Sequence, residues 1–212
     1  MARQRRHTEP LKTLRGTLTD YAEIDRFLLD GEFKGRSWIF ERSQAAPLLS
    51  TYDDHDIRAL HRVMFGDILE WAGEFRTDER GPGGQVFIPW YHVAVAVRTF
   101  TDNLGAWVAA LSPDPVLEEL AGVMASAHHE FQRIHPFRDT NGRTGRVLDL
   151  YLLWVTFGLK KDSVASSPTI EPFPTAAEED AYYEGLREAD NHRPERLRNY
   201  YCERLAAVFE AG

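Results

Sequence analysis

The sequence predicts a mostly α-helical fold in a single domain, with one small β-hairpin. Along most of the chain, apolar residues recur at intervals of three and four, which is the period of an amphipathic helix. A chain of 212 residues of which 43% are hydrophobic can bury one substantial core. The sequence contains no repeat, no low-complexity tract and no linker of the length that separates domains.

The first clear helical period begins at Ile57 and continues through Met64 and Ile68, and we expect this helix to end at Gly73. A turn rich in glycine and proline follows. The short β-prone run after it contains a proline, which would confine it to the edge of a sheet. These signals predict a hairpin over Arg76–Pro89.

Helical periods also predict the elements that follow the hairpin. The expected helices are Tyr91–Leu111, Asp114–Ile134, Asn141–Phe157, Ala176–Ala189 and Pro194–Glu210. The helix ending at Phe157 is apolar on most sides, so we expect it to lie at the buried centre, with Gly158 as its C-cap. The segment Lys160–Pro174 contains three prolines and is expected to be a loop.

Composition limits the compartment and the partners. A formal net charge of −8 argues against nucleic acid as the main partner, because phosphate binding usually shows as a basic excess. No apolar run reaches the roughly 18 residues that span a bilayer, and the N-terminus has no signal-peptide core. The single cysteine, Cys202, suits a reducing compartment. We expect a cytoplasmic protein that binds no membrane, although an effector delivered into another cell would have the same composition. Residues 1–15 are basic and are expected to form a disordered terminus.

The segment Ile134–Arg146, with the sequence IHPFRDTNGRTGR, is the part of the chain suited to phosphate chemistry. A polar loop that leads into an apolar helix offers free backbone N–H groups and the positive end of the helix dipole to an anion. Arg143 and Arg146 oppose that dipole, a local cost most simply explained by a bound polyphosphate. His135 could accept a proton, and Asp139 could hold Mg²⁺.

This segment resembles the signature of the Fic family, H-P-F-x-[D/E]-G-N-G-R-x-x-R, at every fixed position except Thr140, where the family usually has glycine. Residues 60–77 (LHRVMFGDILEWAGEFRT) resemble the family's first core helix and its W-A-G-E turn, and residues 181–190 resemble the helix that closes the core. The resemblance covers roughly residues 20 to 205. It implies a helical Fic domain at 16–212 with its core at about 55–205, and a hairpin flap over the active-site loop.

The resemblance implies a protein adenylyltransferase, which moves AMP from ATP to a Tyr, Thr or Ser hydroxyl of a target protein and releases pyrophosphate. His135 would be the general base, and Asp139 would hold Mg²⁺. Gly142 stands where relatives that transfer a phosphoryl group have lysine, and it leaves room for the β-phosphate. The implied nucleotide-binding residues are Arg138, Thr140, Asn141, Gly142, Arg143 and Arg146, with the Asn141 amide directed at the α-phosphate. The implied flap residues, which would align the target by strand addition, are Val86, Phe87 and Ile88.

Two alternatives stay open. One is a catalytically weak or inactive module that binds a nucleotide or a peptide, and the departure at Thr140 is the feature that favours it. The other is a Fic transferase that uses another nucleotide or diphosphate donor. A β-branched residue is strained at positive φ, so we expect a negative φ at Thr140.

The resemblance also bears on regulation. Short bacterial members often serve as toxins that a small antitoxin restrains. Self-inhibited members share an [S/T]-x-x-x-E-[G/N] helix whose glutamate pairs with the second motif arginine, here Arg146. Glu184 precedes a glycine, but Asp180 rather than Ser or Thr stands four residues before it. The glutamates that fit only the first half of the pattern are Glu23, Glu41, Glu130, Glu171 and Glu179. Of these, Glu41 and then Glu23 are the candidates that stay open, since an N-terminal helix could reach the site. We therefore expect no built-in inhibition and a separate partner that restrains the protein.

Overall fold

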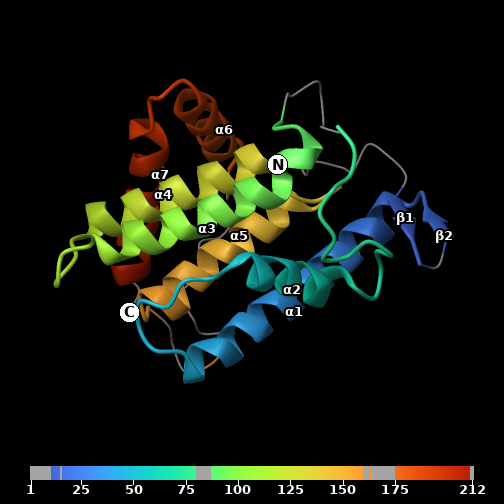
Figure 1. Ribbon diagram of the computed structural model, residues 1–212, viewed down its shortest axis with the longest axis horizontal. Helices are drawn as coiled ribbons and strands as arrows, with labels where there is room; N and C mark the ends of the chain where they lie inside the picture. Colours follow the sequence, from blue (N-terminus) through green and yellow to red (C-terminus); the bar gives the residue numbers. More distant parts are fainter. Residues whose placement is uncertain (1–10, 15, 80–86, 160–162, 164–174, 211–212) are drawn as a thin grey trace.

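The computed structural model of the protein describes residues 11–14, 16–79, 87–159, 163 and 175–210. These residues are mainly helical (Figure 1), which confirms the predicted fold class. The helices are α1 (Tyr21–Ala45), α2 (Asp54–Phe65), α3 (Val93–Ala109), α4 (Leu117–Ile134), α5 (Asn141–Tyr151), α6 (Ala176–Asp190) and α7 (Glu195–Glu210). A 3-10 turn, η2 (Trp90–His92), precedes α3, and a π-helical turn, η3 (Leu152–Thr156), continues α5.

Helix α5 and its continuation η3 form the centre of the molecule. Every residue from Val147 to Thr156 is buried. Helices α1 and α4 both pack against α5, and α3 packs against α4. Figure 1 shows α6 and α7 on one side of this central group and α1 and α2 on the other. Because α5 begins inside the motif segment, the packing of the core fixes the position of the motif.

The five helices expected after the hairpin are all present, with small shifts at their ends. The expected buried helix corresponds to α5 and η3 together, and Gly158 follows it with φ 71°. No described helix is both long enough and apolar enough to cross a membrane.

Helix α2 is shorter than the sequence predicted. It ends at Phe65 and not at Gly73, because a series of turns begins at Gly66. The N–H groups of Ile68 and Leu69 both donate to the Phe65 carbonyl, which ends the helical ladder. Both of these side chains stay buried, so the apolar pattern continues beyond the helix itself.

Helix α1 was not among the helices that the apolar period predicted. Its interior contains Gly31 and Gly35, and glycine counts against a helix interior. Both glycines face α2: a Cβ on Gly31 would lie 2.5 Å from the Met64 carbonyl oxygen, and a Cβ on Gly35 would lie 2.8 Å from Met64 Cγ. The glycines therefore let α1 approach α2 more closely than larger side chains would allow.

The expected disordered terminus contains a small hairpin. Strands β1 (Leu11–Thr13) and β2 (Gly16–Leu18) pair antiparallel, with Leu11 opposite Leu18. Gly16 has φ 113°, a conformation that glycine adopts without strain, and it allows the short turn. Residues 11–13 of this terminus thus form strand β1, residues 1–10 and 15 lie outside the described residues, and the expectation of disorder stays a prediction.

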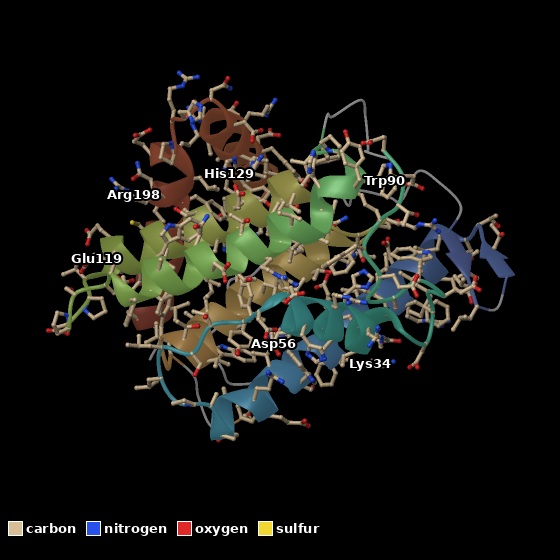
Figure 2. All side chains as sticks on the ribbon, in the orientation of Figure 1. Lys34, Asp56, Trp90, Glu119, His129 and Arg198 are labelled. Carbon is tan, nitrogen blue, oxygen red and sulfur yellow. The ribbon has the colours of Figure 1, made fainter. Side chains whose placement is uncertain are left out.

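Two other expected segments are described only in part. Within Arg76–Pro89, the structure describes residues 76–79 and 87–89, and none of these is in a strand. Val86 and the rest of the expected hairpin tip lie outside the described residues, as does Lys160–Pro174 apart from Ser163. Trp90 follows this segment and begins the approach to α3 (Figure 2).

A buried polar network around Asp149 of α5 joins four helices. His128 Nδ1 lies 2.9 Å from the Asp149 carboxylate, and the Tyr201 hydroxyl donates to the same carboxylate at 2.9 Å. His128 Nε2 forms a hydrogen bond with the Tyr182 hydroxyl. The network connects α4, α5, α6 and α7, and Asp149 is its shared acceptor.

We expect Asp149→Ala to lower the free energy of unfolding by about 3 kcal/mol, because it leaves His128 and Tyr201 without their acceptor inside the core. Urea denaturation at pH 7 measures the change. The control is Glu184→Ala, which removes an exposed ion pair with Arg196 and should cost less than about 1 kcal/mol. Equal losses in the two variants would show that the network does not hold the helices together.

Candidate active site

The loop that joins α4 to α5 lies between two residues in the left-handed backbone region. His135 ends α4 at φ 50°, and Thr140 precedes α5 at φ 63°. The expectation of a negative φ at Thr140 was therefore wrong. Such a conformation costs a residue other than glycine about 1–3 kcal/mol, so contacts from the surrounding structure have to hold it.

Phe137 and Asn141 close the loop on itself. The Asn141 side chain accepts the Phe137 N–H at 2.9 Å and donates to the Phe137 carbonyl at 2.8 Å. Phe137 is fully buried and stacks on the His61 ring, with centroids 3.8 Å apart. The sequence led us to expect the Asn141 amide on a phosphate, but both of its polar atoms are committed to the loop.

Arg76, which lies outside the loop in the sequence, forms hydrogen bonds that hold the loop in place. Its backbone N–H donates to the Pro136 carbonyl at 2.8 Å, and its Nε donates to the His135 carbonyl at 2.8 Å. The same guanidinium donates to the carbonyl groups of Asp78 and Ile88. Burial lowers the pKa of Arg76 from its ordinary value. One buried arginine thus joins the loop to both ends of the predicted flap. Arg76 was not among the residues expected in the site, although its place just after the W-A-G-E turn distinguishes it.

His135 lies under the ring of Phe87. The two rings are stacked, with centroids 3.9 Å apart and 19° between their planes. Burial lowers the pKa of His135 to about 4, against the opposing effect of the Gln132 backbone carbonyl, and the positive charge of Arg76 lowers it further. The imidazole is therefore neutral at pH 7, the form that can accept a proton.

The other predicted residues gather at the start of α5. Asp139 is half-buried, and its carboxylate accepts the Thr140 N–H. A Cβ on Gly142 would lie 3.6 Å from Arg146 Nη1, so this guanidinium lies beside the glycine. Arg138 is exposed.

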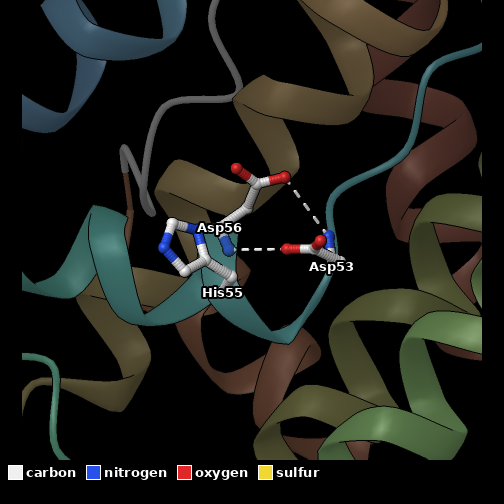
Figure 3. Close-up of side chains that lie close together, drawn as sticks. All are labelled: Asp53, His55 and Asp56. Atoms are coloured by element: carbon white, nitrogen blue, oxygen red, sulfur yellow. Dashed lines mark hydrogen bonds between the residues drawn. The ribbon is translucent and has the colours of Figure 1, made fainter.

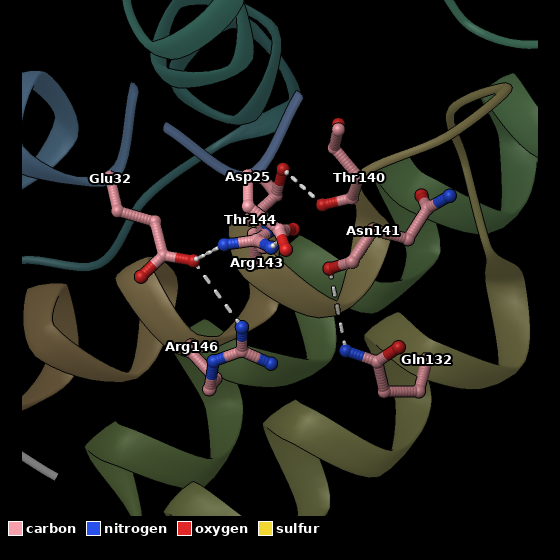
Figure 4. Close-up of polar contacts among 8 residues, drawn as sticks. All are labelled: Asp25, Glu32, Gln132, Thr140, Asn141, Arg143, Thr144 and Arg146. Atoms are coloured by element: carbon pink, nitrogen blue, oxygen red, sulfur yellow. Dashed lines mark hydrogen bonds and ion pairs between the residues drawn. The ribbon is translucent and has the colours of Figure 1, made fainter. Parts of the chain in front are cut away.

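Helix α1 supplies carboxylates to the two motif arginines (Figure 4). Glu32 Oε1 lies 2.8 Å from Arg143 Nη1 and 3.3 Å from Arg146 Nη2. Asp25 Oδ1 lies 3.5 Å from Arg143 Nη2. These ion pairs offset the repulsion between two arginines that would otherwise face each other and the positive end of the α5 dipole.

Comparison with known proteins agrees with the motif. The sequence profile of the Fic/DOC family matches residues 51–153, which include the whole loop. The chain belongs to the Fic/DOC family.

Two relatives of this Fic domain carry the name adenylyltransferase. The "Probable protein adenylyltransferase y4lH" of Sinorhizobium fredii is 31% identical over 134 residues, which are 61% of this chain and 64% of the relative. The "Protein adenylyltransferase Fic" of Drosophila willistoni is 38% identical over 96 residues, which are 44% of this chain and 18% of the relative. The matches thus span less than two thirds of either relative.

A solved structure supports the fold. The crystal structure of BepC, a VirB-translocated effector protein of Bartonella tribocorum with bound AMPPNP, superimposes with a TM-score of 0.67. The superposition covers 92% of each chain at 17% sequence identity. At this identity the likeness concerns the fold alone.

Glu32 is a carboxylate of the same chain that contacts the motif arginines, but it does not fit the inhibitory motif. Leu28 stands four residues before Glu32 and Phe33 follows it, so Glu32 meets neither half of the pattern. The ion pairs with Arg143 and Arg146 nevertheless place a carboxylate of the same chain at both motif arginines. The expectation of no built-in inhibition and of a separate restraining partner stays a prediction.

The surroundings of Asp139 fit a Mg²⁺ ion. Mg²⁺ in phosphate-transfer sites takes one or two carboxylates together with oxygens of the substrate phosphates. Asp139 offers one carboxylate immediately before a helix start that carries two arginines, and the Thr140 N–H orients that carboxylate. The residues present therefore match the donor set that the ion prefers.

A second group of possible metal ligands has a structural explanation. Asp53, His55 and Asp56 lie close together at the start of α2 (Figure 3). Asp53 and Asp56 form the capping box of this helix, and Asp56 also pairs with Arg42. These contacts account for the group without an ion.

We expect the His135 ring to titrate near pH 4, and Phe87→Ala to raise its pKa toward the ordinary value of about 6.5, because the variant exposes the ring to water. A base works only when deprotonated, so the acidic limb of any activity that depends on His135 should move to higher pH. An NMR titration of the His135 Cε1–H measures the pKa. Phe33→Ala, which removes an exposed ring from α1, should leave the titration unchanged. The same pKa in wild type and Phe87→Ala would contradict the role of the stacked ring.

Proposed function

We propose that this Fic domain is a Mg²⁺-dependent protein adenylyltransferase that moves AMP from ATP to a hydroxyl side chain of a target protein. One observation carries the proposal: a neutral, shielded His135 and the arginine-bearing start of α5 lie at the two ends of one rigid loop. The names of the two relatives and the AMPPNP bound to BepC support the nucleotide as donor.

In the proposed step, His135 takes the proton from the target hydroxyl. The hydroxyl oxygen attacks the α-phosphorus, the bond from this phosphorus to the oxygen that bridges to the β-phosphate breaks, and pyrophosphate leaves with the electron pair. The first backbone N–H groups of α5 lack acceptors within the helix, so they can stabilise the charge that develops on the α-phosphate. Asp139 would hold Mg²⁺, which when bound neutralises charge on the phosphates.

Arg143 and Arg146 suit the β- and γ-phosphates, because a guanidinium donates two parallel hydrogen bonds to an oxyanion. Gly142 has no side chain to occupy the place of the β-phosphate, which favours a donor with a full polyphosphate tail; a Cβ there would already lie 3.6 Å from Arg146 Nη1. Another nucleotide or diphosphate donor would use the same arginines. Segment Val86–Ile88 is proposed to align the target, because Arg76 donates to the carbonyl groups of both Ile88 and His135 and so holds the described end of this segment next to His135.

We also infer that Glu32 restrains the reaction. Its carboxylate occupies donors of both arginines and would repel the phosphates that need them. A nucleotide has to displace this carboxylate before it can bind productively. This inference replaces the separate antitoxin expected from the sequence with the chain's own first helix.

We expect His135→Ala to reduce AMP transfer by at least about 100-fold, because the attacking hydroxyl loses its proton acceptor, while the Kd for ATP stays nearly unchanged. The measurement incubates the protein with Mg²⁺, bacterial lysate and ATP labelled on the α-phosphate. A parallel reaction uses ATP labelled on the γ-phosphate. The control His55→Ala removes an exposed histidine from α2 and should transfer at the wild-type rate.

The pattern of labelling separates the alternatives. Label from the γ-phosphate alone would mean phosphoryl transfer, and ATP binding without transfer by the wild type would favour the inactive binding module. Transfer by His135→Ala at the wild-type rate would remove His135 as the base.

We expect Glu32→Gln to raise AMP transfer about tenfold and to lower the Kd for ATP, because the neutral amide keeps the size of the side chain but releases both arginines from ion pairs. The labelled-ATP assay and calorimetric titration of ATP measure the two effects. Glu41→Gln removes an exposed carboxylate from the same helix and serves as the matched control. Equal transfer by all three proteins would show that the ion pairs of Glu32 are structural only.

A further inference from the structure

Thr140 replaces the usual glycine of the signature and makes a contact that glycine cannot make. The residue is buried and adopts φ 63°. Its hydroxyl donates to the Asp139 carbonyl at 2.6 Å and lies 2.9 Å from Nε2 of His61 on α2. The Thr140 hydroxyl is therefore held by two hydrogen bonds, one to Asp139 and one to His61.

The directions of these hydrogen bonds follow from one backbone donor. The Gly73 N–H donates to Nδ1 of His61 at 2.9 Å, so this nitrogen carries the lone pair of the neutral ring. The proton of the ring is then on Nε2, which donates to the Thr140 hydroxyl oxygen. The Thr140 hydroxyl donates onward to the Asp139 carbonyl. The hydrogen bonds thus run from the Gly73 N–H through His61 and Thr140 to the Asp139 carbonyl, which also accepts from the His61 ring.

His61 is a rigid reference point for the loop. Its side chain is completely buried, and its ring stacks on Phe137 and packs against Phe65 and Trp71. The Gly73 N–H occupies Nδ1, which leaves the ring with its single N–H on Nε2. The hydrogen-bonded position of Thr140 is thus set by the core, not by the loop alone.

Thr140 in turn forms hydrogen bonds with two residues of the site, Asp139 and Thr144. Its N–H donates to the Asp139 carboxylate, and its carbonyl accepts both the N–H of Thr144 at 2.9 Å and the Thr144 hydroxyl at 3.0 Å. The residue therefore touches the carboxylate that would hold Mg²⁺ and the first turn of α5.

We propose that His61 is a positioning residue for the transfer reaction: through the hydroxyl of Thr140 it holds the Asp139 carboxylate and the phosphate-binding start of α5 in their working geometry. The inference rests on the proposed function. It also explains the departure from glycine, because the bond to His61 offsets the strain that a threonine meets at positive φ. His61 and Thr140 act together by positioning, and neither residue contacts a reacting atom.

The first test compares Thr140→Ser with Thr140→Val. Serine keeps the hydroxyl, and its kcat should stay within about threefold of wild type. Valine keeps the branched shape but removes the hydroxyl that joins His61 Nε2 to the loop, and its kcat should fall by about 10- to 100-fold. A control, Thr101→Val, removes another buried hydroxyl, which bonds the Arg98 carbonyl on α3; it should not change kcat.

The second measurement needs no catalysis. Hydrogen exchange of the backbone amides of residues 141–144 should be about tenfold faster in Thr140→Val than in wild type, and unchanged in Thr140→Ser and Thr101→Val. If the wild-type protein transfers no AMP, the proposed function fails, while these exchange rates still decide whether His61 and Thr140 anchor the start of α5.

A double variant tests the coupling. His61→Ala should reduce kcat as Thr140→Val does, and adding Thr140→Gly should recover about tenfold, because glycine adopts the left-handed backbone without the bond to His61. Wild-type kcat and wild-type exchange rates in Thr140→Val would overturn the proposal. So would a double variant no more active than His61→Ala.

Discussion

The backbone polar groups of the turn where α4 ends need hydrogen-bond partners, and this requirement organises the whole site. The carbonyl groups of Ile134, His135 and Pro136 point inward where α4 ends, and all three accept hydrogen bonds from Arg76. Without that arginine the turn at His135 would leave carbonyl groups unsatisfied in the core, at a cost of about 1–3 kcal/mol for each. The orientation of the proposed base therefore depends on a residue almost sixty positions earlier in the chain.

The other end of the loop has a similar arrangement. Asn141 satisfies the backbone of Phe137, and His61 reaches the loop through the Thr140 hydroxyl. The loop is thus held from α2 and from the turns that follow α2. A motif that looks local in the sequence is fixed by the segment before the flap, which explains why the family resemblance extends well upstream of the motif itself.

The parts of the molecule that the sequence predicted well are those that depend on neighbours in the chain. The period of apolar residues located α3 to α7, and the motif located His135 and the start of α5. The errors concern contacts between distant segments. The glycines of α1 lower its helix propensity, so the sequence did not show a helix whose stability comes from packing on α2. The positive φ of Thr140 depends on a bond to His61. The carboxylate at Arg143 and Arg146 could not be recognised from a motif, since Glu32 is brought there by the packing of α1 and not by its neighbours in sequence.

The glycine contacts between α1 and α2 determine how the arginines can be released. Because neither Gly31 nor Gly35 has room for a Cβ, the two helices touch through their backbones and around Met64, and α1 cannot swing away without opening the core. The carboxylate of Glu32 has to leave by rotation of its own side chain, a motion on the order of nanoseconds or faster for an accessible residue. The Glu32 carboxylate then competes with the nucleotide phosphates for the two arginines, at an effective concentration that is fixed because it belongs to the same chain. The fraction of molecules whose arginines are free of Glu32 would therefore be set by the nucleotide concentration, and not by a slow displacement of α1.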